Sequence, residues 1–353
     1  MIIRILLVAA AALGSAFASR LHAEPPAVNG TMVLSGLDSP RAIAVQPTTF
    51  DWFISEGGSG RIVRFTPSGT AKEPQPVITG FAVRDFGENP AYKIGPLGLA
   101  FIDKDTLVVG GGDLGPGADL VRIYAVPPVG KSIPVEETKV FSETKPGGKL
   151  GPLPAVEPSK TGEGNFFSVA VNLKTGNLYA LGQGDPDKGW IVKADLIAGK
   201  PGDLKRYLST KKESGYAGAF ALTQSERGEL VVGTRGEPDT TRSAMLTFFH
   251  KNTGKALLSV RTGLNEIVAL AYSKKTGYLY ALDMSTREPD QGGLYRLDDD
   301  GQGGVKPFKI AALDRPTAMA FTGDGMNLLV TILGKFPTDS NDKPGQVIKF
   351  MGL

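Results

Sequence analysis

The sequence of 353 residues contains no cysteine and only two histidines, His22 and His250. The absence of cysteine excludes disulfides, thiolate metal sites, cysteine nucleophiles and a lipid-modified N-terminal cysteine. With so few histidines, a catalytic Ser-His-Asp arrangement lacks its middle member. The fold therefore has to be held by burial alone, for which a chain of this length is ample.

Long apolar runs are also scarce. The charge-free run from Ile5 to Leu13 follows Arg4 and precedes small-residue cleavage patterns that end at Ala18 and Ala23. This arrangement is typical of a secretory signal, and the run is too short to span a bilayer comfortably. We therefore predict that residues 1–23 are a signal peptide, with an uncleaved anchor as the alternative. The mature domain, residues 24–353, is expected to be secreted or periplasmic, without a stable membrane anchor after cleavage.

Neither sign of charge is in large excess. The chain has 39 Lys and Arg against 36 Asp and Glu, a net charge of +3. Cleavage after Ala23 would remove Arg4 and Arg20 and leave +1. No basic footprint for a nucleic acid is present, so no nucleic-acid partner is expected.

What the chain does contain is a repeat of six similar stretches, each with a small residue, an apolar residue, an alanine and an apolar residue. Ala44 and Ala320, the central alanines of the first and last stretches, are 276 residues apart, or about 55 residues for each of five intervals. A period near 50 residues, built of short strands, is typical of β-propeller blades. The stretches are Ala42–Val45, Gly98–Phe101, Ser168–Val171, Ala219–Leu222, Ala269–Tyr272 and Ala318–Phe321.

Each stretch is followed by a tight turn, a second apolar run and a third strand, and a fourth strand precedes the next stretch. The first such fourth strand, Met32-Val33-Leu34, comes before the first repeat, whereas the last repeat ends after its third strand at Phe350. The sequence therefore predicts an all-β, six-bladed β-propeller whose N-terminal strand completes the last blade and closes the ring. Such closure removes exposed sheet edges.

The third strands carry one basic residue each, except in the fourth repeat. We expect these side chains to reach solvent while their stems pack on neighbouring strands. His250 ends the third strand of the fourth repeat, where we expect an outer-strand histidine and not a catalytic base. The basic residues are Arg64, Arg122, Lys193, Arg296 and Lys349.

The long connections fall on one face of the predicted ring, and elaborated loops on a rigid scaffold are where function usually lies. The Pro/Gly-rich insertion within residues 142–165 could be a lid or an inert loop, and the sequence does not choose. The long connections are Ala82–Gly95, Ser142–Asn165, Thr234–Ser243, Asp283–Gly292 and Leu333–Gly345.

The stretch Gly36–Val45, followed by Trp52–Glu56, resembles an NHL-type repeat, as do Gly95–Ala100 and Arg315–Ala320. More broadly, residues 30–352 resemble the six-bladed propellers grouped as SMP-30/gluconolactonase and strictosidine-synthase-like proteins. The resemblance implies an architecture. It does not choose an activity, because the superfamily includes hydrolases, quinone-dependent sugar dehydrogenases and binding modules. The dehydrogenases use a histidine base. In this chain His22 lies in the predicted signal peptide and His250 is expected on an outer strand, so neither is a good candidate for that base.

The residues three positions before the small residue of each repeat should ring the mouth of the central channel. From this region we select Arg41, Asn165, Tyr216 and Arg315 as candidate ligand-binding residues, because two arginines at the mouth favour an anionic or polar ligand. The predicted ring is Ser39, Gly95, Asn165, Tyr216, Glu266 and Arg315.

The resemblance also implies a divalent cation, held in the channel by a glutamate, an aspartate and asparagines. Asn165, Asn265, Glu266 and Asp283 could supply oxygen ligands suited to calcium or magnesium. The family's glutamate in the first repeat is replaced here by Ser39-Pro40-Arg41. The alternative is that these residues are ordinary turn and cap positions.

Two functions follow from these observations. The first is a binding or interaction module that presents its loop-rich face to a small polar ligand or a partner protein. The alternative is a metal-dependent lactone hydrolase of the SMP-30/gluconolactonase kind. The sequence assigns no catalytic residue and leaves open whether the protein is an enzyme.

Overall fold

The computed structural model describes residues 25–70, 73–87, 91–141, 148–157, 159–185, 189–237, 239–335 and 342–353. The predicted signal peptide, residues 1–23, and residues 142–147 of the insertion lie outside the described residues. Export therefore stays a prediction.

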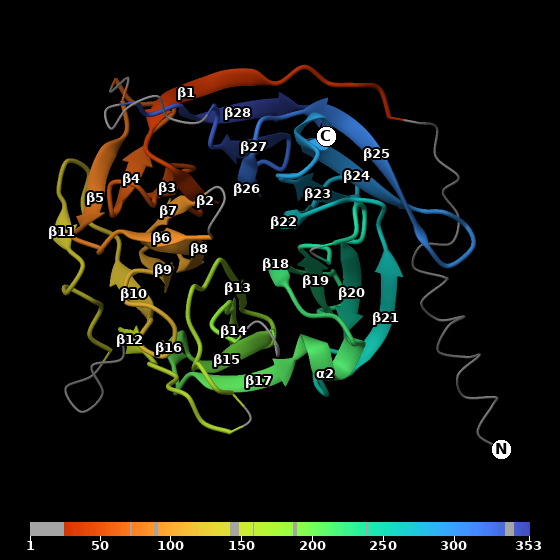
Figure 1. Ribbon diagram of the computed structural model, residues 1–353. Coiled ribbons are helices and arrows are strands. Elements are labelled where there is room, and N and C mark those ends of the chain that lie inside the picture. The colour runs from red at the N-terminus through yellow and green to blue at the C-terminus, as the bar shows by residue number, and fades with distance from the viewer. Residues whose placement is uncertain are drawn as a thin grey trace.

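Six sheets stand in a ring around one axis, as the repeat predicts (Figure 1). Sheet 1 contains β2 (Pro40–Val45), β3 (Trp52–Glu56), β4 (Arg61–Phe65) and β5 (Gln75–Thr79), with β11 (Ile133–Pro134) parallel to β5 at its edge. Sheet 2 contains β8 (Pro96–Asp103), β9 (Thr106–Gly111), β10 (Val121–Ala125) and β12 (Lys149–Leu150). Sheet 3 contains β13 (Ser168–Asn172), β14 (Asn177–Leu181), β15 (Trp190–Ile197), β16 (Lys200–Pro201) and β17 (Lys205–Ser209).

The second half of the ring repeats this plan. Sheet 4 contains β18 (Ala219–Gln224), β19 (Leu230–Thr234), β20 (Met245–Phe249) and β21 (Ala256–Arg261). Sheet 5 contains β22 (Ile267–Tyr272), β23 (Leu279–Asp283), β24 (Gly293–Asp299) and β25 (Val305–Ala312). Sheet 6 contains β26 (Pro316–Phe321), β27 (Asn327–Ile332), β28 (Gly345–Met351) and the N-terminal β1 (Thr31–Leu37). The remaining elements are the hairpin of β6 (Arg84–Phe86) and β7 (Tyr92–Ile94), the helix α2 (Thr210–Ser214) and the 3-10 turn η1 (Pro289–Gln291).

The N-terminal strand β1 lies along the outside of β28 (Figure 1). The pairing is antiparallel, with Met32 opposite Ile348 and Leu34 opposite Val347. The first described strand therefore occupies the fourth position in the sheet that contains the last strand.

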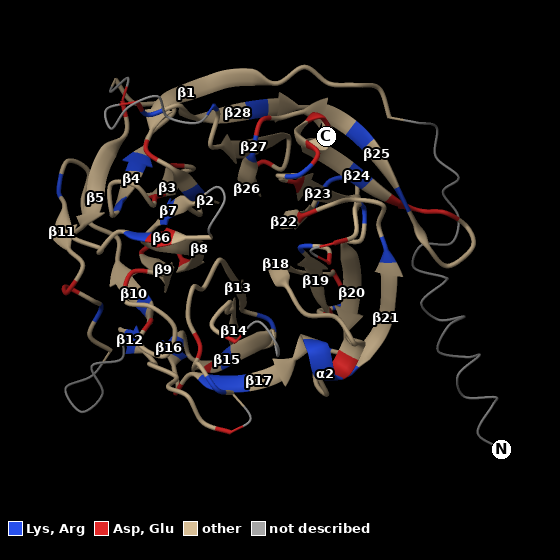
Figure 2. Ribbon diagram, viewed as in Figure 1, with Lys and Arg blue, Asp and Glu red and all other residues tan. Residues whose placement is uncertain are grey.

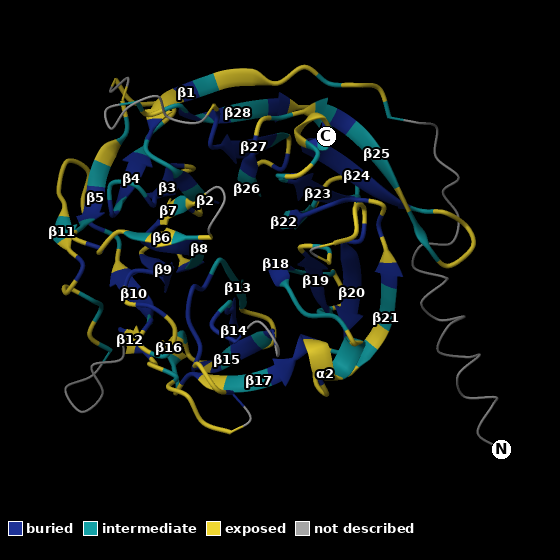
Figure 3. Cartoon of the chain, viewed as in Figure 1, coloured by how far each residue is buried: buried dark blue, intermediate teal, exposed yellow. Residues whose placement is uncertain are grey.

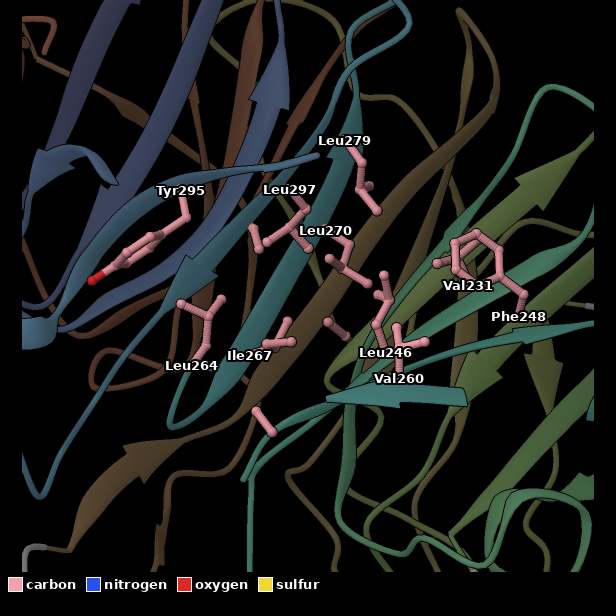
Figure 4. Packing of buried hydrophobic residues seen from close by; sticks show 13 residues of the cluster. Val231, Leu246, Phe248, Val260, Leu264, Ile267, Leu270, Leu279, Tyr295 and Leu297 are labelled. Carbon is pink, nitrogen blue, oxygen red and sulfur yellow. The ribbon is translucent and has the colours of Figure 1, made fainter. Parts of the chain in front are cut away.

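Buried apolar side chains fill the space between neighbouring sheets. Six such clusters occur among the described residues, one at each junction, and one of them joins Leu34 and Val347 of sheet 6 to Ile54 of sheet 1. Figure 4 shows the cluster between sheets 4 and 5, in which Leu246 packs near Ile267. Replacing one such leucine with alanine would cost about 2–5 kcal/mol of folding free energy. The second strand of each sheet, counted from the channel, is almost entirely buried (Figure 3).

The small residues of the inner strands are required by close approach. A Cβ added at Gly98 of β8 would lie 2.9 Å from the backbone nitrogen of Val169 in β13. That distance is shorter than a normal carbon contact, so only glycine fits here without movement of the neighbouring strand.

The third-strand basic side chains were expected to reach solvent. This expectation was wrong for the three arginines among the five basic residues. Arg64, Arg122 and Arg296 are 6%, 3% and 7% exposed. Each is paired with an aspartate and lies over an aromatic ring. The pairs are Arg64 with Asp51 and Phe53, Arg122 with Asp113 and Phe81, and Arg296 with Asp298 and Tyr278. In each case the carboxylate and the aromatic ring make burial of the charge tolerable.

Within the described part of the chain, no helix has the length and apolar character needed to cross a membrane.

Candidate functional site

The inner strands all begin at the same end of the channel, and the residues just before them form its mouth. Ser39, Asn165 and Arg315 have φ angles of 51°, 48° and 50°. This left-handed backbone is uncommon for residues other than glycine, and such strain concentrates where a site has to be held in shape. The predicted ring positions of three repeats therefore share one unusual conformation.

The fourth repeat has a different register from the one predicted. A bulge in β18 places Ala219 opposite Thr234 and Ala221 opposite Gly233. Ala221, and not Ala219, is then the counterpart of Ala42, which lies opposite Ser55 after the bulge in β2. The residue equivalent to Ser39 is therefore Gly218, with a φ of 68°.

Tyr216 is two residues further from β18 than the prediction required. Its backbone N–H donates to the hydroxyl of Ser214 in the last turn of α2. The sequence pattern could not show this shift, because both Ala219 and Ala221 satisfy it.

Three of the four predicted metal ligands lie together, but in a different role. The Asp283 carboxylate accepts hydrogen bonds from the backbone N–H groups of Glu266 (2.8 Å) and Asn265 (2.9 Å). Burial raises the pKa of Asp283 above its usual value, and these backbone donors oppose that rise. Leu264 and Ile267, on either side of the pair, are buried in the cluster between sheets 4 and 5 (Figure 4). Asp283 thus fixes a bend of the chain.

The remaining oxygens of this group are also occupied. Asn265 accepts from the N–H of Arg242 through Oδ1, and its Nδ2 donates to Ser285 and Glu288. Glu266 accepts from Arg235 through Oε1 and from the N–H and hydroxyl of Thr286 through Oε2.

Asn165, the fourth proposed ligand, is held separately. Its N–H donates to Asp119 at 2.8 Å, and its buried Oδ1 has no hydrogen-bond partner among the described residues. Nor do any three acidic or histidine side chains of the described ranges form a group suited to a metal. The residues present therefore do not fit the divalent cation that the resemblance implies, because Asn165 is held separately and hydrogen bonds from the protein already orient the oxygens of the other three.

A group of charged side chains that the sequence only partly identified surrounds Tyr92 at the mouth. We call Arg41, Tyr92, Arg235, Glu266 and Arg315 the mouth cluster. Burial raises the pKa of Tyr92, and the charges of all four neighbours act on its hydroxyl. The Arg41 guanidinium lies 5.3 Å from the centre of the Tyr92 ring. Tyr92 belongs to the β6–β7 hairpin, which projects toward the centre of the ring (Figure 1).

Arg41 is the basic residue of β2 (Figure 2). Of the charged side chains in the mouth cluster, it has the least opposite charge around it. It donates two hydrogen bonds, of 3.0 and 2.7 Å, to the carbonyl of Lys93 and forms no ion pair within the described ranges. Burial, together with the nearby charge of Arg315, lowers the pKa of Arg41 to about 10, although Tyr92 opposes this. Arg315 is 8% exposed and lies 3.4 Å from the exposed Asp314.

Arg235 is fully paired, in contrast. Its Nε and Nη2 donate to Glu266 at 3.1 and 2.9 Å. Burial by itself would raise the pKa of Glu266, but Arg235 and the hydrogen bonds from Thr286 bring it below the usual value.

Two cavities adjoin this cluster. The channel cavity, of about 360 Å³, lies among the six inner strands and reaches Arg41. The side cavity, of about 390 Å³, is bordered by Arg235 and Glu266 of the cluster and by Phe86, Phe220, Thr240 and Arg287. Both are near the lower size limit of small-molecule sites.

Sequence reasoning missed Phe86, Tyr92, Phe220 and Arg235. Phe86 and Tyr92 lie in the long connection 82–95, whose length was the available signal. Arg235 directly follows the second strand of its sheet, at the end where Glu56 and Asp283 close theirs. His250 lies in the turn after β20, where its Nδ1 accepts from the N–H groups of Asn252 and Thr253. It is remote from the mouth, as predicted.

The sequence matches no family model and no curated protein. Solved structures of similar fold include the PQQ-bound aldose sugar dehydrogenase of Streptomyces coelicolor, with 16% identity, a TM-score of 0.59, and coverage of 93% of this chain and 99% of that one. A gluconolactonase of Xanthomonas campestris has 11% identity, a TM-score of 0.58, and coverage of 94% and 99%. A luciferin-regenerating enzyme has 14% identity, a TM-score of 0.59, and coverage of 92% and 96%. Sugar dehydrogenase and gluconolactonase propellers are the kinds that the sequence resembles, so the predicted architecture is confirmed. At this identity the likeness concerns the fold alone; whether the repeats are NHL repeats stays a prediction.

Proposed function

We propose that this propeller is a binding protein for a small anionic ligand, which it takes at the mouth of the central channel. The acid group of the ligand lies against Arg41 and Arg315, and the body of the ligand occupies the side cavity. Arg41 carries the proposal, because its partly buried guanidinium forms no ion pair in the described part of the chain and feels the charge of Arg315 nearby. An anion would supply the missing charge, and guanidinium groups suit carboxylates and phosphates.

A small ligand fits better than a partner protein, because the charges are recessed. Arg315 is 8% exposed, and Arg41 is partly buried beneath Lys93. A protein partner would bind to protruding side chains, whereas a small anion can reach the two recessed arginines. Since residues 1–23 are predicted to direct export, we propose that the ligand is encountered outside the cytoplasm.

The lactone hydrolase remains the alternative, and the gluconolactonase among the similar folds favours it. The side chains argue against its metal-dependent form, because Glu266, Asp283 and Asn265 use their oxygens within the protein. Each of these oxygens already accepts a hydrogen bond from the protein, and no three acidic or histidine side chains of the described ranges gather as a metal site would require.

The test is thermal unfolding and calorimetry of the mature domain with phosphate, acetate, citrate and benzoate. We expect at least one anion to bind saturably, since a ligand at one hundred times its dissociation constant adds about 2.7 kcal/mol of stability. Replacing Arg41 with methionine should weaken that binding about tenfold, the effect of losing one charged contact.

The matched control is Lys274→Ala, which removes an exposed charge from the β22–β23 turn on the opposite face. This control should bind as the wild type does. Binding of no anion, or equal binding by the Arg41→Met and wild-type proteins, would contradict the proposal. Hydrolysis of a lactone panel that requires added calcium would favour the alternative.

A further inference from the structure

The wall of the side cavity is built from aromatic rings that three distant segments bring together. Phe86 of the β6–β7 hairpin lies with its ring centre 5.0 Å from that of Phe167, which precedes β13. Phe167 in turn lies 4.7 Å from Phe220 of β18. Phe86 and Phe220 both border the cavity. The hairpin is thereby packed against sheets 3 and 4, and the cavity acquires an aromatic side.

Arg235 extends this aromatic wall with a flat cation. Its guanidinium lies 5.4 Å from the ring centre of Phe220, and Glu266 holds it by two hydrogen bonds to one carboxylate oxygen. The Arg235 side chain is nevertheless 44% exposed, and it borders the cavity. A guanidinium with its orientation fixed and part of its surface accessible is a platform on which a flat π-system stacks.

The polar groups beside this platform are poorly suited to a ligand with many hydroxyls. Both oxygens of Glu266 accept from Arg235 and Thr286, and the amide of Asn265 is bonded at both of its ends. A polyol bound here would have to take its partners from exposed side chains at the rim, such as Thr240, Thr241 and Arg287, because the groups beside Arg235 are already hydrogen-bonded. A ring with a single acid group makes no such demand.

We infer that the ligand is a planar aromatic acid. Its ring stacks on Arg235 along the Phe86–Phe220 wall, and its carboxylate points to the cationic side of the mouth cluster. This inference depends on the proposed function, because it names the class of anion that the same site takes. It separates this chain from the sugar-acting proteins that share its fold.

The experiment compares four probes by calorimetry on the mature domain: benzoate, cyclohexanecarboxylate, gluconate and benzyl alcohol. Benzoate and cyclohexanecarboxylate carry the same acid group on rings of the same carbon count, and only the first ring is flat. We expect benzoate to bind about tenfold more tightly than cyclohexanecarboxylate or gluconate, as ring stacking contributes. Benzyl alcohol, which lacks the charge, should bind weakest.

Arg235→Lys tests the platform itself, because lysine keeps the charge and the partner Glu266 but has no flat group. The preference for benzoate over cyclohexanecarboxylate should fall from about tenfold to about one, with cyclohexanecarboxylate binding unchanged. The matched control is Arg261→Lys, at the exposed end of β21 and outside the lining of both cavities. It should retain the preference.

The outcomes separate the two proposals. Equal affinity for the two ring acids, or tighter binding of gluconate, would overturn the aromatic inference and leave the anion site standing. An unchanged preference in Arg235→Lys would overturn it as well. Binding of phosphate, acetate or citrate but of none of these three acids would likewise overturn only the aromatic inference, whereas binding of no anion at all would overturn both proposals.

Discussion

Arginines occur in two regions of this propeller, and the two groups are treated in opposite ways. Inside the sheets, Arg122 and Arg296 each face an aspartate through two hydrogen bonds, and all four side chains are buried. At the mouth, Arg41 is partly buried against a carbonyl and next to another arginine, and it forms no ion pair in the described ranges. The first arrangement stabilises the blade, whereas the second leaves a charge to be compensated by something else.

The comparison teaches that burial of a charge does not by itself reveal its purpose. Arg122 has no reason to attract a ligand, because Asp113 already occupies its donors at 2.8 and 2.9 Å. An incompletely compensated charge held in place by the fold is what a functional site requires, at some expense of stability. Three substitutions test the difference.

The largest effect is expected at the buried pair. Replacing Arg122 with alanine should lower the free energy of unfolding by about 3–5 kcal/mol, because Asp113 would keep a buried charge without its partner. Urea unfolding measures this directly. The control is Lys349→Ala, the equivalent third-strand position of sheet 6, where the loss should be about 0.5 kcal/mol or less. Equal losses in the two variants would show that the buried pair has no special role.

A smaller effect is expected for Glu266, the carboxylate of the mouth cluster that pairs with Arg235. Glu266→Gln should lower the free energy of unfolding at pH 7 by about 1.5–3 kcal/mol, the range for hydrogen bonds to a charged group. The pKa of Glu266 lies below its ordinary 4.5, so its stabilising charge is fully present above pH 4.5. That contribution is lost as the pH falls through the lowered pKa.

The difference between wild type and Glu266→Gln should therefore shrink when urea unfolding is repeated near pH 3. A difference that stayed constant from pH 7 to pH 3 would mean that the carboxylate charge contributes nothing.

The smallest effect on stability is expected for Arg41. Because burial lowers the pKa of Arg41, the folded state holds this proton less readily than the unfolded chain does, and the charge is unfavourable at neutral pH. Arg41→Met should change the free energy of unfolding by less than about 1 kcal/mol, in either direction. It should nevertheless weaken anion binding, which the calorimetry described above measures. A loss as large as that of Arg122→Ala would make Arg41 a structural residue and remove the contrast.

Much of the fold could be predicted because the residue pattern within each repeat is enough to identify its strands. The small residues at Gly98 and its counterparts mark the inner strands, since neighbouring backbones come too close there for a side chain. The position of Met32 before the first repeat was enough to predict its partner in the last sheet. These signals depend on residue size and order along the chain, which the sequence contains in full.

The site could be predicted only in part. Arg41, Arg315 and Glu266 were found because they follow from the repeat, whereas Tyr216 was misplaced by a bulge that leaves no mark in the pattern. Tyr92 and Phe86 were missed because they lie in a hairpin outside the repeat pattern, which carries them to the mouth. The proposed calcium ligands were selected by residue type, and residue type does not say whether an oxygen is already bonded.

The sequence by itself determined the number of sheets, their strand order and the strand that completes the last of them, because side-chain alternation and residue size act between neighbours along the chain. The tertiary structure alone decided which charges are compensated. Compensation depends on distances of a few ångströms between segments far apart in sequence, such as Arg235 and Glu266, and on the water that packing removes around them.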